Sequence, residues 1–114
     1  MDCLFCKIIK KEIVSQLVYE DADLMAIKDI NPQAPVHLLI IPKKHIATLN
    51  DLTEKDASLQ GKLLSTATKL AREMGIHEKG YRTVINCNRE GGQSVYHLHL
   101  HLLGGRQLGG SMVG

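Results

Sequence analysis

Apolar residues recur along the chain with two different spacings, and the helical spacing occurs twice. The segment LFCKIIKKE, residues 4–12, places its apolar residues at steps of three and four and predicts a short helix. A longer helix is expected to begin at Thr53, a good N-cap residue that has Asp56 three positions on. Its apolar stripe consists of Leu59, Leu63, Ala67, Leu70, Ala71 and Met74. Gly75 predicts the end of this helix, because glycine suits the left-handed position after a C-cap.

The remaining apolar segments have the composition of strands. LVYED and ADLMAIKDI predict two short strands around an acidic turn. NPQAP breaks regular pairing with its two prolines, and the apolar run VHLLIIP that follows predicts a central strand that ends at Pro42. YRTVINC and VYHLHLHLL predict the last two strands.

The order of these elements indicates the fold class. A short helix, three strands, a long helix and two strands follow one another, and most links between strands are short. Short links favour antiparallel pairing, so we expect an α+β fold with a five-stranded antiparallel sheet and helices packed against it. No repeat or linker divides the chain, which predicts a single domain over residues 1–114.

Composition and charge exclude several classes of protein. The formal net charge of the 114 residues is only +2, from basic and acidic residues spread along the chain, so we expect no nucleic-acid binding. The longest apolar run, VHLLIIP, is far shorter than the roughly 20 residues that span a bilayer, so we expect no membrane partner. The chain also has no apolar leader, which predicts a cytoplasmic protein.

The segment HLHLH, residues 97–101, holds half of the six histidines. Because side chains alternate along a strand, the leucines are expected to face the core and the histidines the opposite face. Residues two apart on a strand are separated by about 6.5 to 7 Å, so one metal ion could not easily bind all three histidines. We therefore expect a row of imidazoles available for chemistry.

The segment EGGQS lies directly before this row. Gly91 and Gly92 permit positive φ and close approach of the backbone. Gln93, Ser94 and Val95 could then present backbone N–H groups and a hydroxyl to an anion. The sequence therefore predicts a phosphate-binding loop beside the histidines.

Three blocks of sequence together resemble a known family. HLHLHLL has the His-φ-His-φ-His-φ-φ pattern of the histidine triad superfamily, where φ is an apolar residue. DINPQAPVHLLIIPKKHI and GYRTVINCNREGGQSVYHLHLHLLGGRQ agree with the Hint branch, the histidine triad nucleotide-binding proteins, in order and spacing. The resemblance runs from about Phe5 to Gln107.

The resemblance implies a purine nucleoside 5′-phosphoramidate hydrolase that forms a covalent nucleotidyl-histidine. His99 would attack the α-phosphorus, and the backbone carbonyl of the first triad histidine would set its tautomer. The implied catalytic residues are His99, His101, His97 and Ser94. The implied substrate-binding residues are Phe5, Ile8, Asp29, Ile30, Leu39, Asn86, Gly92, Gln93, Ser94, Val95 and His37. Asp29 would accept the ribose hydroxyls, and the apolar members would enclose the base, although they could equally be core.

The resemblance also bears on a metal ion and a partner chain. Cys3 and Cys6 form C-x-x-C, and in a reducing compartment this spacing favours metal binding or redox chemistry. Some triad proteins with this pair bind structural zinc through two further ligands, which here correspond to His45 and His97. Two reduced cysteines at a helix start are the alternative. No organic cofactor is implied, and family members are homodimers whose sheets join across the interface.

Two other functions stay open at this point. The protein could be a nucleotide-binding interaction module with incidental turnover. The histidines could instead form a metal-storage or metal-sensing face.

Overall fold

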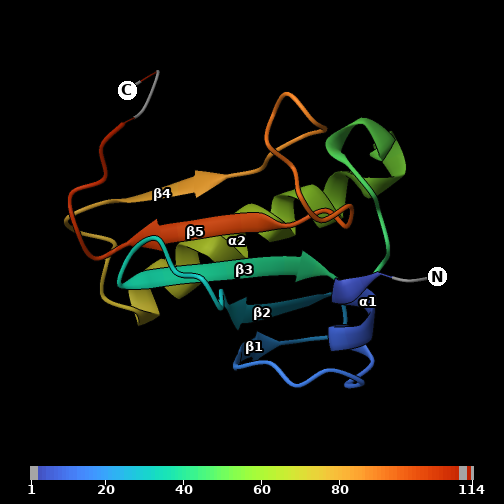
Figure 1. Cartoon of the computed structure of the whole chain (residues 1–114), viewed down its shortest axis with the longest axis horizontal. Helices are drawn as coiled ribbons and strands as arrows, with labels where there is room; N and C mark the ends of the chain where they lie inside the picture. The colour runs from blue at the N-terminus through green and yellow to red at the C-terminus, as the bar shows by residue number, and fades with distance from the viewer. Residues whose placement is uncertain (1–2, 111–112, 114) are drawn as a thin grey trace.

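The computed structural model describes residues 3–110 and residue 113 (Figure 1). In chain order, the helices and strands are α1 (Leu4–Ile9), β1 (Leu17–Glu20), β2 (Leu24–Lys28), β3 (Val36–Pro42), α2 (Ala57–Glu73), β4 (Tyr81–Val84) and β5 (Leu100–Gly104). Two short 3₁₀ turns, Leu49–Asp51 and Glu54–Asp56, precede α2. This order is the predicted one.

The five strands form one antiparallel sheet in the order β1-β2-β3-β5-β4, which confirms the predicted α+β class. The last strand, β5, inserts between β3 and β4 and pairs Leu39 with His101 on one side and Val84 with His101 on the other. The last strand of the chain is therefore an inner strand of the sheet, next to the edge strand β4.

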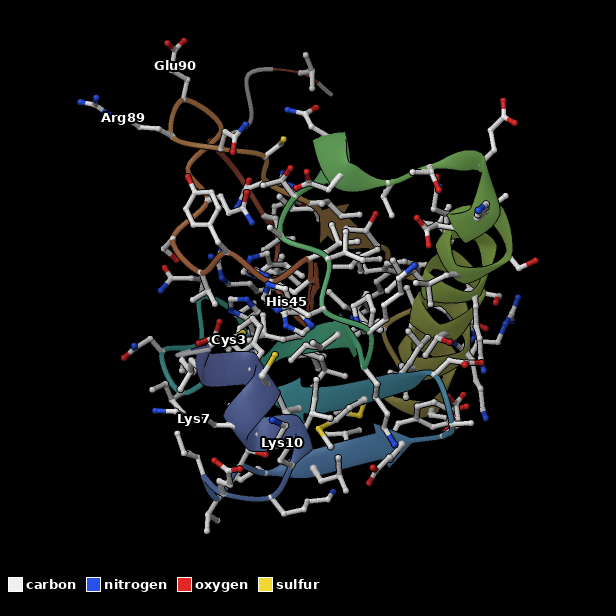
Figure 2. The ribbon with its side chains drawn as sticks, turned by 90° about the vertical axis from the view of Figure 1, so that its right-hand side faces the viewer. Cys3, Lys7, Lys10, His45, Arg89 and Glu90 are labelled. Carbon is white, nitrogen blue, oxygen red and sulfur yellow. The ribbon has the colours of Figure 1, made fainter. Side chains whose placement is uncertain are left out.

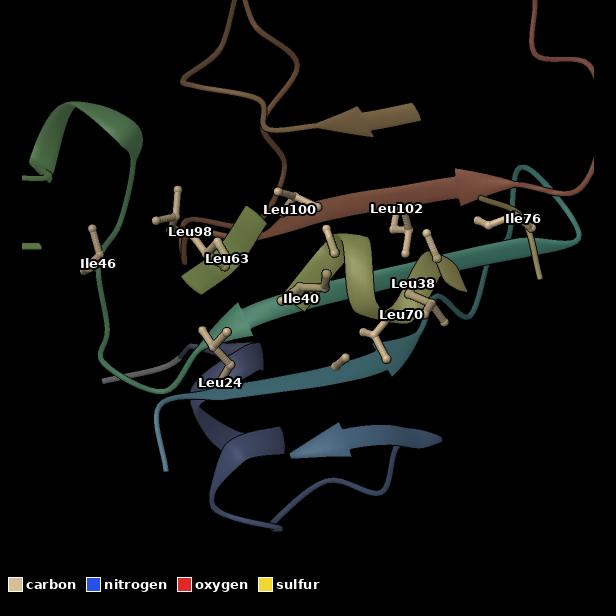
Figure 3. Close-up of a cluster of buried hydrophobic side chains, with 13 residues drawn as sticks. Leu24, Leu38, Ile40, Ile46, Leu63, Leu70, Ile76, Leu98, Leu100 and Leu102 are labelled. Atoms are coloured by element: carbon tan, nitrogen blue, oxygen red, sulfur yellow. The ribbon is translucent and has the colours of Figure 1, made fainter. Parts of the chain in front are cut away.

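The two helices cover opposite faces of the sheet. In Figure 1, α2 runs behind the strands and α1 lies near one end of them. The core under α2 contains Leu24, Ala26, Leu38, Ile40, Ile46, Leu63, Ala67, Leu70, Ala71, Ile76, Leu98, Leu100 and Leu102 (Figure 3). A smaller apolar cluster under α1 contains Cys3, Phe5, Ile8, Met25, Ile27, Leu39 and Ile41. Strands β2 and β3 supply alternate residues to the two clusters, so both faces of these strands are apolar.

The predicted capping residues are confirmed. Thr53 and Asp56 form a reciprocal capping box, although the first turn after Thr53 is a 3₁₀ turn and α2 proper begins at Ala57. Gly75, directly after the C-cap residue Met74, has φ of 73°, the left-handed conformation expected of it.

Two predicted elements are longer than the observed ones. The short helix ends at Ile9, because Lys11 adopts a φ of 64° that a helix does not allow. The strand predicted over residues 95–103 begins only at Leu100, where pairing with β3 begins. Residues 95–99 leave the ladder, and the N–H of Leu98 instead donates to the carbonyl oxygen of Ile46 at 2.6 Å.

No helix within residues 3–110 is long and apolar enough to cross a membrane.

The carboxylate of Asp21 organises the acidic turn between β1 and β2. Its Oδ1 accepts from the backbone N–H groups of Asp23 and Leu24, and its Oδ2 accepts from the hydroxyl of Tyr19 at 2.6 Å. The Tyr19 hydroxyl above all, with these amides and Lys62, holds the pKa of the Asp21 carboxyl well below its usual range. The folded state therefore favours the ionised carboxylate.

We predict that Asp21→Asn lowers the free energy of unfolding at pH 7 by about 1 to 2 kcal/mol, because charge-assisted hydrogen bonds are lost. A lowered pKa stabilises the fold fully above the pKa of an unfolded aspartate, about 3.9, and this stabilisation declines as pH falls below it. Urea titrations of the wild type and Asp21→Asn between pH 7 and pH 2.5 should show that the difference in their free energies of unfolding becomes smaller toward low pH. Asp23→Asn is the matched control, since this side chain is 60% exposed. A difference that does not depend on pH would contradict this account.

Gly91 lets the loop between β4 and β5 fold back on itself. A Cβ at this position would collide with the carbonyl oxygen of Cys87 and lie 2.9 Å from the Cys87 nitrogen. The predicted close approach of the backbone thus occurs within the loop. Gly92 has the predicted positive φ, 84°.

We predict that Gly91→Ala lowers the free energy of unfolding by about 1 to 3 kcal/mol, because the clash is with backbone that cannot rotate away. Gly61→Ala is the control, because nothing lies within 4 Å of a Cβ there. That control should gain about 0.5 to 1 kcal/mol, since alanine is the better helix former. Denaturant unfolding of the wild type, Gly91→Ala and Gly61→Ala checks the direction of both changes. Equal free energies of unfolding for the wild type and Gly91→Ala would rule out the proposed clash.

Candidate active site and metal centre

The three histidines of HLHLH and the leucines between them point in opposite directions, as predicted. Leu98, Leu100 and Leu102 lie in the core under α2, and each is at most 1% exposed. The ring of His99 lies on the other side of the sheet, where its centroid is 5.0 Å from that of Phe5 on α1. The alternation thus holds although residues 97–99 lie outside the strand.

His99 has an imidazole whose two nitrogens have different environments. Its Nδ1–H donates to the carbonyl oxygen of His97 at 2.7 Å, which leaves the lone pair of the neutral ring on Nε2. No other described residue hydrogen-bonds this Nε2. Within the described part of the chain, every fully buried side-chain nitrogen has a partner, so this atom is not fully buried and reaches solvent. Burial lowers the pKa of the His99 ring. His99 therefore presents an unprotonated, accessible nitrogen at neutral pH.

His101 lies next to His99, with ring centroids 4.9 Å apart. Burial above all, and then the neighbouring His99 and His37, lower the pKa of His101 to about 4. Its Nδ1 faces Nε2 of His37 at 3.0 Å. Burial therefore favours the neutral form of both His99 and His101, whose rings pack against each other.

Four donor atoms from three segments meet at the start of α1. We call Cys3, Cys6, His45 and His97 the metal-donor cluster. Nδ1 of His97 lies 3.3 Å from Sγ of Cys3, 3.6 Å from Sγ of Cys6 and 3.1 Å from Nδ1 of His45. Ligand atoms around a tetrahedral zinc ion with these bond types are about 3.3 to 3.8 Å apart, so the spacing fits such an ion closely. The cluster could hold a metal ion, and Figure 2 shows Cys3 and His45 side by side.

The hydrogen bonds of His97 leave the correct nitrogen free for a metal. Its Nε2 lies 2.7 Å from the carbonyl oxygen of Pro42, and a carbonyl only accepts, so Nε2 carries the proton. Nδ1 then has a free lone pair, and it is this atom that faces the cysteines. In metal sites, the second ring nitrogen of a metal-binding histidine usually donates a hydrogen bond to a carbonyl or carboxylate oxygen. Pro42 is a part of the site that the sequence did not indicate.

The glycine loop uses some of the amides that were expected to face an anion. The N–H of Gln93 donates to Asn88 at 3.0 Å and that of Gly92 donates to Arg89 at 3.0 Å, so neither is open to a ligand. The expectation for Gln93 is wrong on this point: its buried side chain instead bonds the carbonyl oxygens of Ala47 and Val95 and shapes the loop. Arg89 and Glu90 point outward at the loop tip (Figure 2).

Ser94 and Val95 retain free donors. Among the described residues, no acceptor takes the N–H of either one. Both line a surface cavity of about 500 Å³, whose other lining residues are Cys3, Leu4, His45, Ala47 and Tyr96. The cavity thus lies between two members of the metal-donor cluster, Cys3 and His45, and the two residues whose amides are free.

The residues expected to enclose a base are divided. Phe5, Ile8 and Leu39 lie together in the cluster under α1, whereas Ile30 is 90% exposed and does not join them. Asn86 is half-buried in the segment after β4. The same cluster includes Met25, Ile27 and Ile41, which sequence reasoning did not assign to the site. Their signal was the unbroken apolar character of the second and third strands.

Comparison with known proteins agrees with this geometry. The family model for the HIT domain matches residues 10–108. The chain is 50% identical over 108 residues to the purine nucleoside phosphoramidase of Escherichia coli strain K12. This alignment covers 95% of the chain and 91% of the relative.

Solved structures show the same fold. A HIT family hydrolase from Legionella pneumophila has a TM-score of 0.92 and 58% identity, covering 93% of this chain and 95% of the other. A Zn-bound histidine triad family protein from Mycobacterium smegmatis has a TM-score of 0.79 and 33% identity, covering 93% of this chain and 76% of the other. The chain therefore belongs to the histidine triad (HIT) family.

Proposed function

We propose that this protein is a purine nucleoside 5′-phosphoramidate hydrolase that works through a nucleotidyl-histidine at His99. The observation that carries the proposal is the unprotonated, solvent-accessible Nε2 of His99, whose Nδ1–H is held by the His97 carbonyl oxygen at 2.7 Å. Such a nitrogen needs no base before it attacks phosphorus. The E. coli relative, named as a purine nucleoside phosphoramidase at 50% identity, supports the same reaction.

The reaction has two displacement steps. Nε2 of His99 forms a bond to the α-phosphorus while the P–N bond to the amine breaks, and the amine leaves with a proton from Nε2–H of His101. Water then attacks the same phosphorus and gives a proton back to Nε2 of His101, the P–Nε2 bond breaks, and the nucleoside monophosphate is released. The two free N–H groups of Ser94 and Val95 suit the nonbridging oxygens, whose charge is redistributed in both steps.

Nucleoside binding is proposed for residues on the α1 side of the sheet. The Asp29 side chain is 18% exposed and its carboxylate can accept two ribose hydroxyls. Phe5, Ile8 and Leu39 provide apolar surface for the base. The exposed Ile30, Asn86 and the loop residues Gly92 and Gln93 complete the proposed set, the last two by shaping the loop.

We further propose that the metal ion is zinc. Two cysteines and two histidines are ligands that zinc favours, and the spacing of the donor atoms in the metal-donor cluster fits a closed, four-ligand site. The zinc-bound relative supports this choice. A bound ion would fasten α1 to the sheet and supply no catalytic step, because all four ligand positions are filled by the protein.

Assembly and location follow as proposals. Strand β4 is an edge of the sheet, which is compatible with the homodimer that the family resemblance implies. We propose the cytoplasm as the location, because Cys3 and Cys6 must remain reduced to bind an ion.

His99→Ala should lower kcat for an adenosine 5′-phosphoramidate by at least about 10³-fold while nucleotide affinity changes little, because the nucleophile is lost and the binding groups remain. Mass spectrometry after brief incubation and a non-acidic quench should show a nucleotidyl adduct on the wild type and none on the variant. His77→Ala, at an exposed position, is the control and should keep full activity. Full turnover by His99→Ala would contradict the mechanism. Tight nucleotide binding without turnover by the wild type would instead favour a nucleotide-binding interaction module.

Metal analysis of protein purified without chelators should find one zinc ion per chain. Cys6→Ser and His45→Ala should each lose most of it, because a three-ligand remnant binds far more weakly. Cys87→Ser is the matched control, since Cys87 lies outside the cluster. Zinc retained by Cys6→Ser and His45→Ala would contradict the site. More than one tightly bound ion per chain would favour a storage or sensing role.

A further inference from the structure

A second group of polar side chains converges beside His99. Asp29 follows β2, His37 lies on β3 and His101 lies on β5. Nε2 of His37 is 3.0 Å from Nδ1 of His101 and 3.3 Å from Oδ2 of Asp29. We call these three residues the Asp29 cluster. Its centre is the buried His37 ring, which is in reach of two acceptors at once.

The backbone at Gln33 determines which nitrogen of His37 carries the proton. The amide N–H of Gln33 donates to Nδ1 of His37 at 3.1 Å. A backbone amide can only donate, so Nδ1 is the unprotonated nitrogen, and the proton of the neutral ring lies on Nε2. Nε2–H of His37 is therefore a hydrogen-bond donor.

The backbone of Gln33 is itself held in place on its carbonyl side. Its carbonyl oxygen accepts from Nη2 of Arg106 at 2.7 Å and from Nε at 3.2 Å, just beyond β5. The N–H of Asn31 donates to Oδ1 of Asp29 at 2.8 Å. The NPQAP loop thus positions two members of the Asp29 cluster, Asp29 and His37.

The same tautomer argues against a metal ion in this cluster. The three ligand atoms lie within 4.8 Å of one another, as they would around an ion. However, a metal needs the lone pair of Nε2 in His37, and this nitrogen carries the proton. His97 has the opposite arrangement, with its free nitrogen toward the cysteines.

The proton of His37 controls the tautomer of His101. His101 is neutral at pH 7, because burial lowers its pKa to about 4. When His37 donates to Nδ1 of His101, the single proton of His101 must lie on Nε2. No described residue hydrogen-bonds this Nε2, so the atom is not fully buried and is free to donate to a ligand. A departing amine requires a proton at this position.

Asp29 competes for the same proton. Its Oδ1 is already bonded to Asn31, so Oδ2 is the oxygen with capacity for further donors. A ribose hydroxyl that donates to Oδ2 reduces the ability of this oxygen to accept from His37. Nucleoside binding would therefore leave His101 as the main acceptor for His37.

We propose that His37 is a positioning residue that couples ribose binding to catalysis: when ribose occupies Asp29, His37 directs its Nε2–H to His101 and fixes there the tautomer that protonates the leaving amine. This inference rests on the proposed function, from which it takes the contact between ribose and Asp29. If it is correct, the enzyme prefers ribonucleosides for two reasons: they bind through Asp29, and their binding speeds the chemical step.

Histidine ¹⁵N NMR tests the tautomer without any turnover. In the wild type, adenosine should shift His101 to the Nε2–H form, and 2′,3′-dideoxyadenosine, which lacks both hydroxyls, should not. In His37→Leu, which keeps an apolar side chain of similar size, both tautomers should be present with or without adenosine. An Nδ1–H tautomer in the adenosine complex, no response to adenosine, or a His37→Leu spectrum like that of the wild type would overturn the proposal. Asp29→Asn leaves His37 intact and should show the Nε2–H form without ligand.

Leaving-group dependence supplies the kinetic test. His37→Leu should slow the first nucleotidyl transfer from an adenosine 5′-alkylphosphoramidate about 10²-fold. It should slow transfer from adenosine 5′-(4-nitrophenyl phosphate) less than about threefold, because nitrophenolate leaves without a proton. His37→Gln, which can place an N–H near the position of Nε2, should restore part of the loss. Equal slowing of both substrates would mean a merely structural role and overturn the inference. No turnover of either substrate by the wild type would overturn the proposed function, and the NMR measurement would still decide the role of His37.

Discussion

The hydrogen bond between Nε2 of His97 and the carbonyl oxygen of Pro42 supports both halves of the site. Because it takes the ring proton, Nδ1 is left for the metal-donor cluster. Because it holds residue 97 against the end of β3, the backbone carbonyl of His97 is in place to accept from His99 at 2.7 Å. His97 is fully buried, so this arrangement does not compete with water. His97 therefore contacts the metal-donor cluster through its side chain and orients the ring of His99 through its backbone.

Hydrogen bonds to the backbone also explain why similar histidines have different roles. His97 and His99 each donate to a carbonyl oxygen, whereas His37 accepts from an amide. A carbonyl can only accept and an amide can only donate, so each contact selects one tautomer. Burial lowers the pKa of all three triad histidines and keeps the rings neutral. Protein folding thus decides which ring nitrogen of each histidine carries the proton and which has a free lone pair.

The two faces of the sheet have different environments. Strands β2, β3 and β5 bury one set of side chains under α2, which forms the main core (Figure 3). Their alternate residues face α1 and form the apolar wall of the site or the site itself. Tight packing on the core side keeps the backbone of β5 fixed, and this holds His101 in position. The loop after β4 is fastened to the segment that follows β3 by the buried side chain of Gln93, which donates to the carbonyl oxygen of Ala47.

The sequence alone determined the order and type of the elements, the capping box at Thr53, the glycine after α2 and the separation of leucines from histidines. These features depend on local periodicity and backbone preference. It did not determine where β5 begins, which loop amides remain free, or that Ile30 lies in solvent, because those outcomes depend on partners distant in the chain. The tautomers of His37 and His97 were decided only by tertiary structure. A ring proton follows whichever carbonyl or amide the fold brings beside it, and neither Pro42 nor Gln33 has a side chain that would mark it as part of the site.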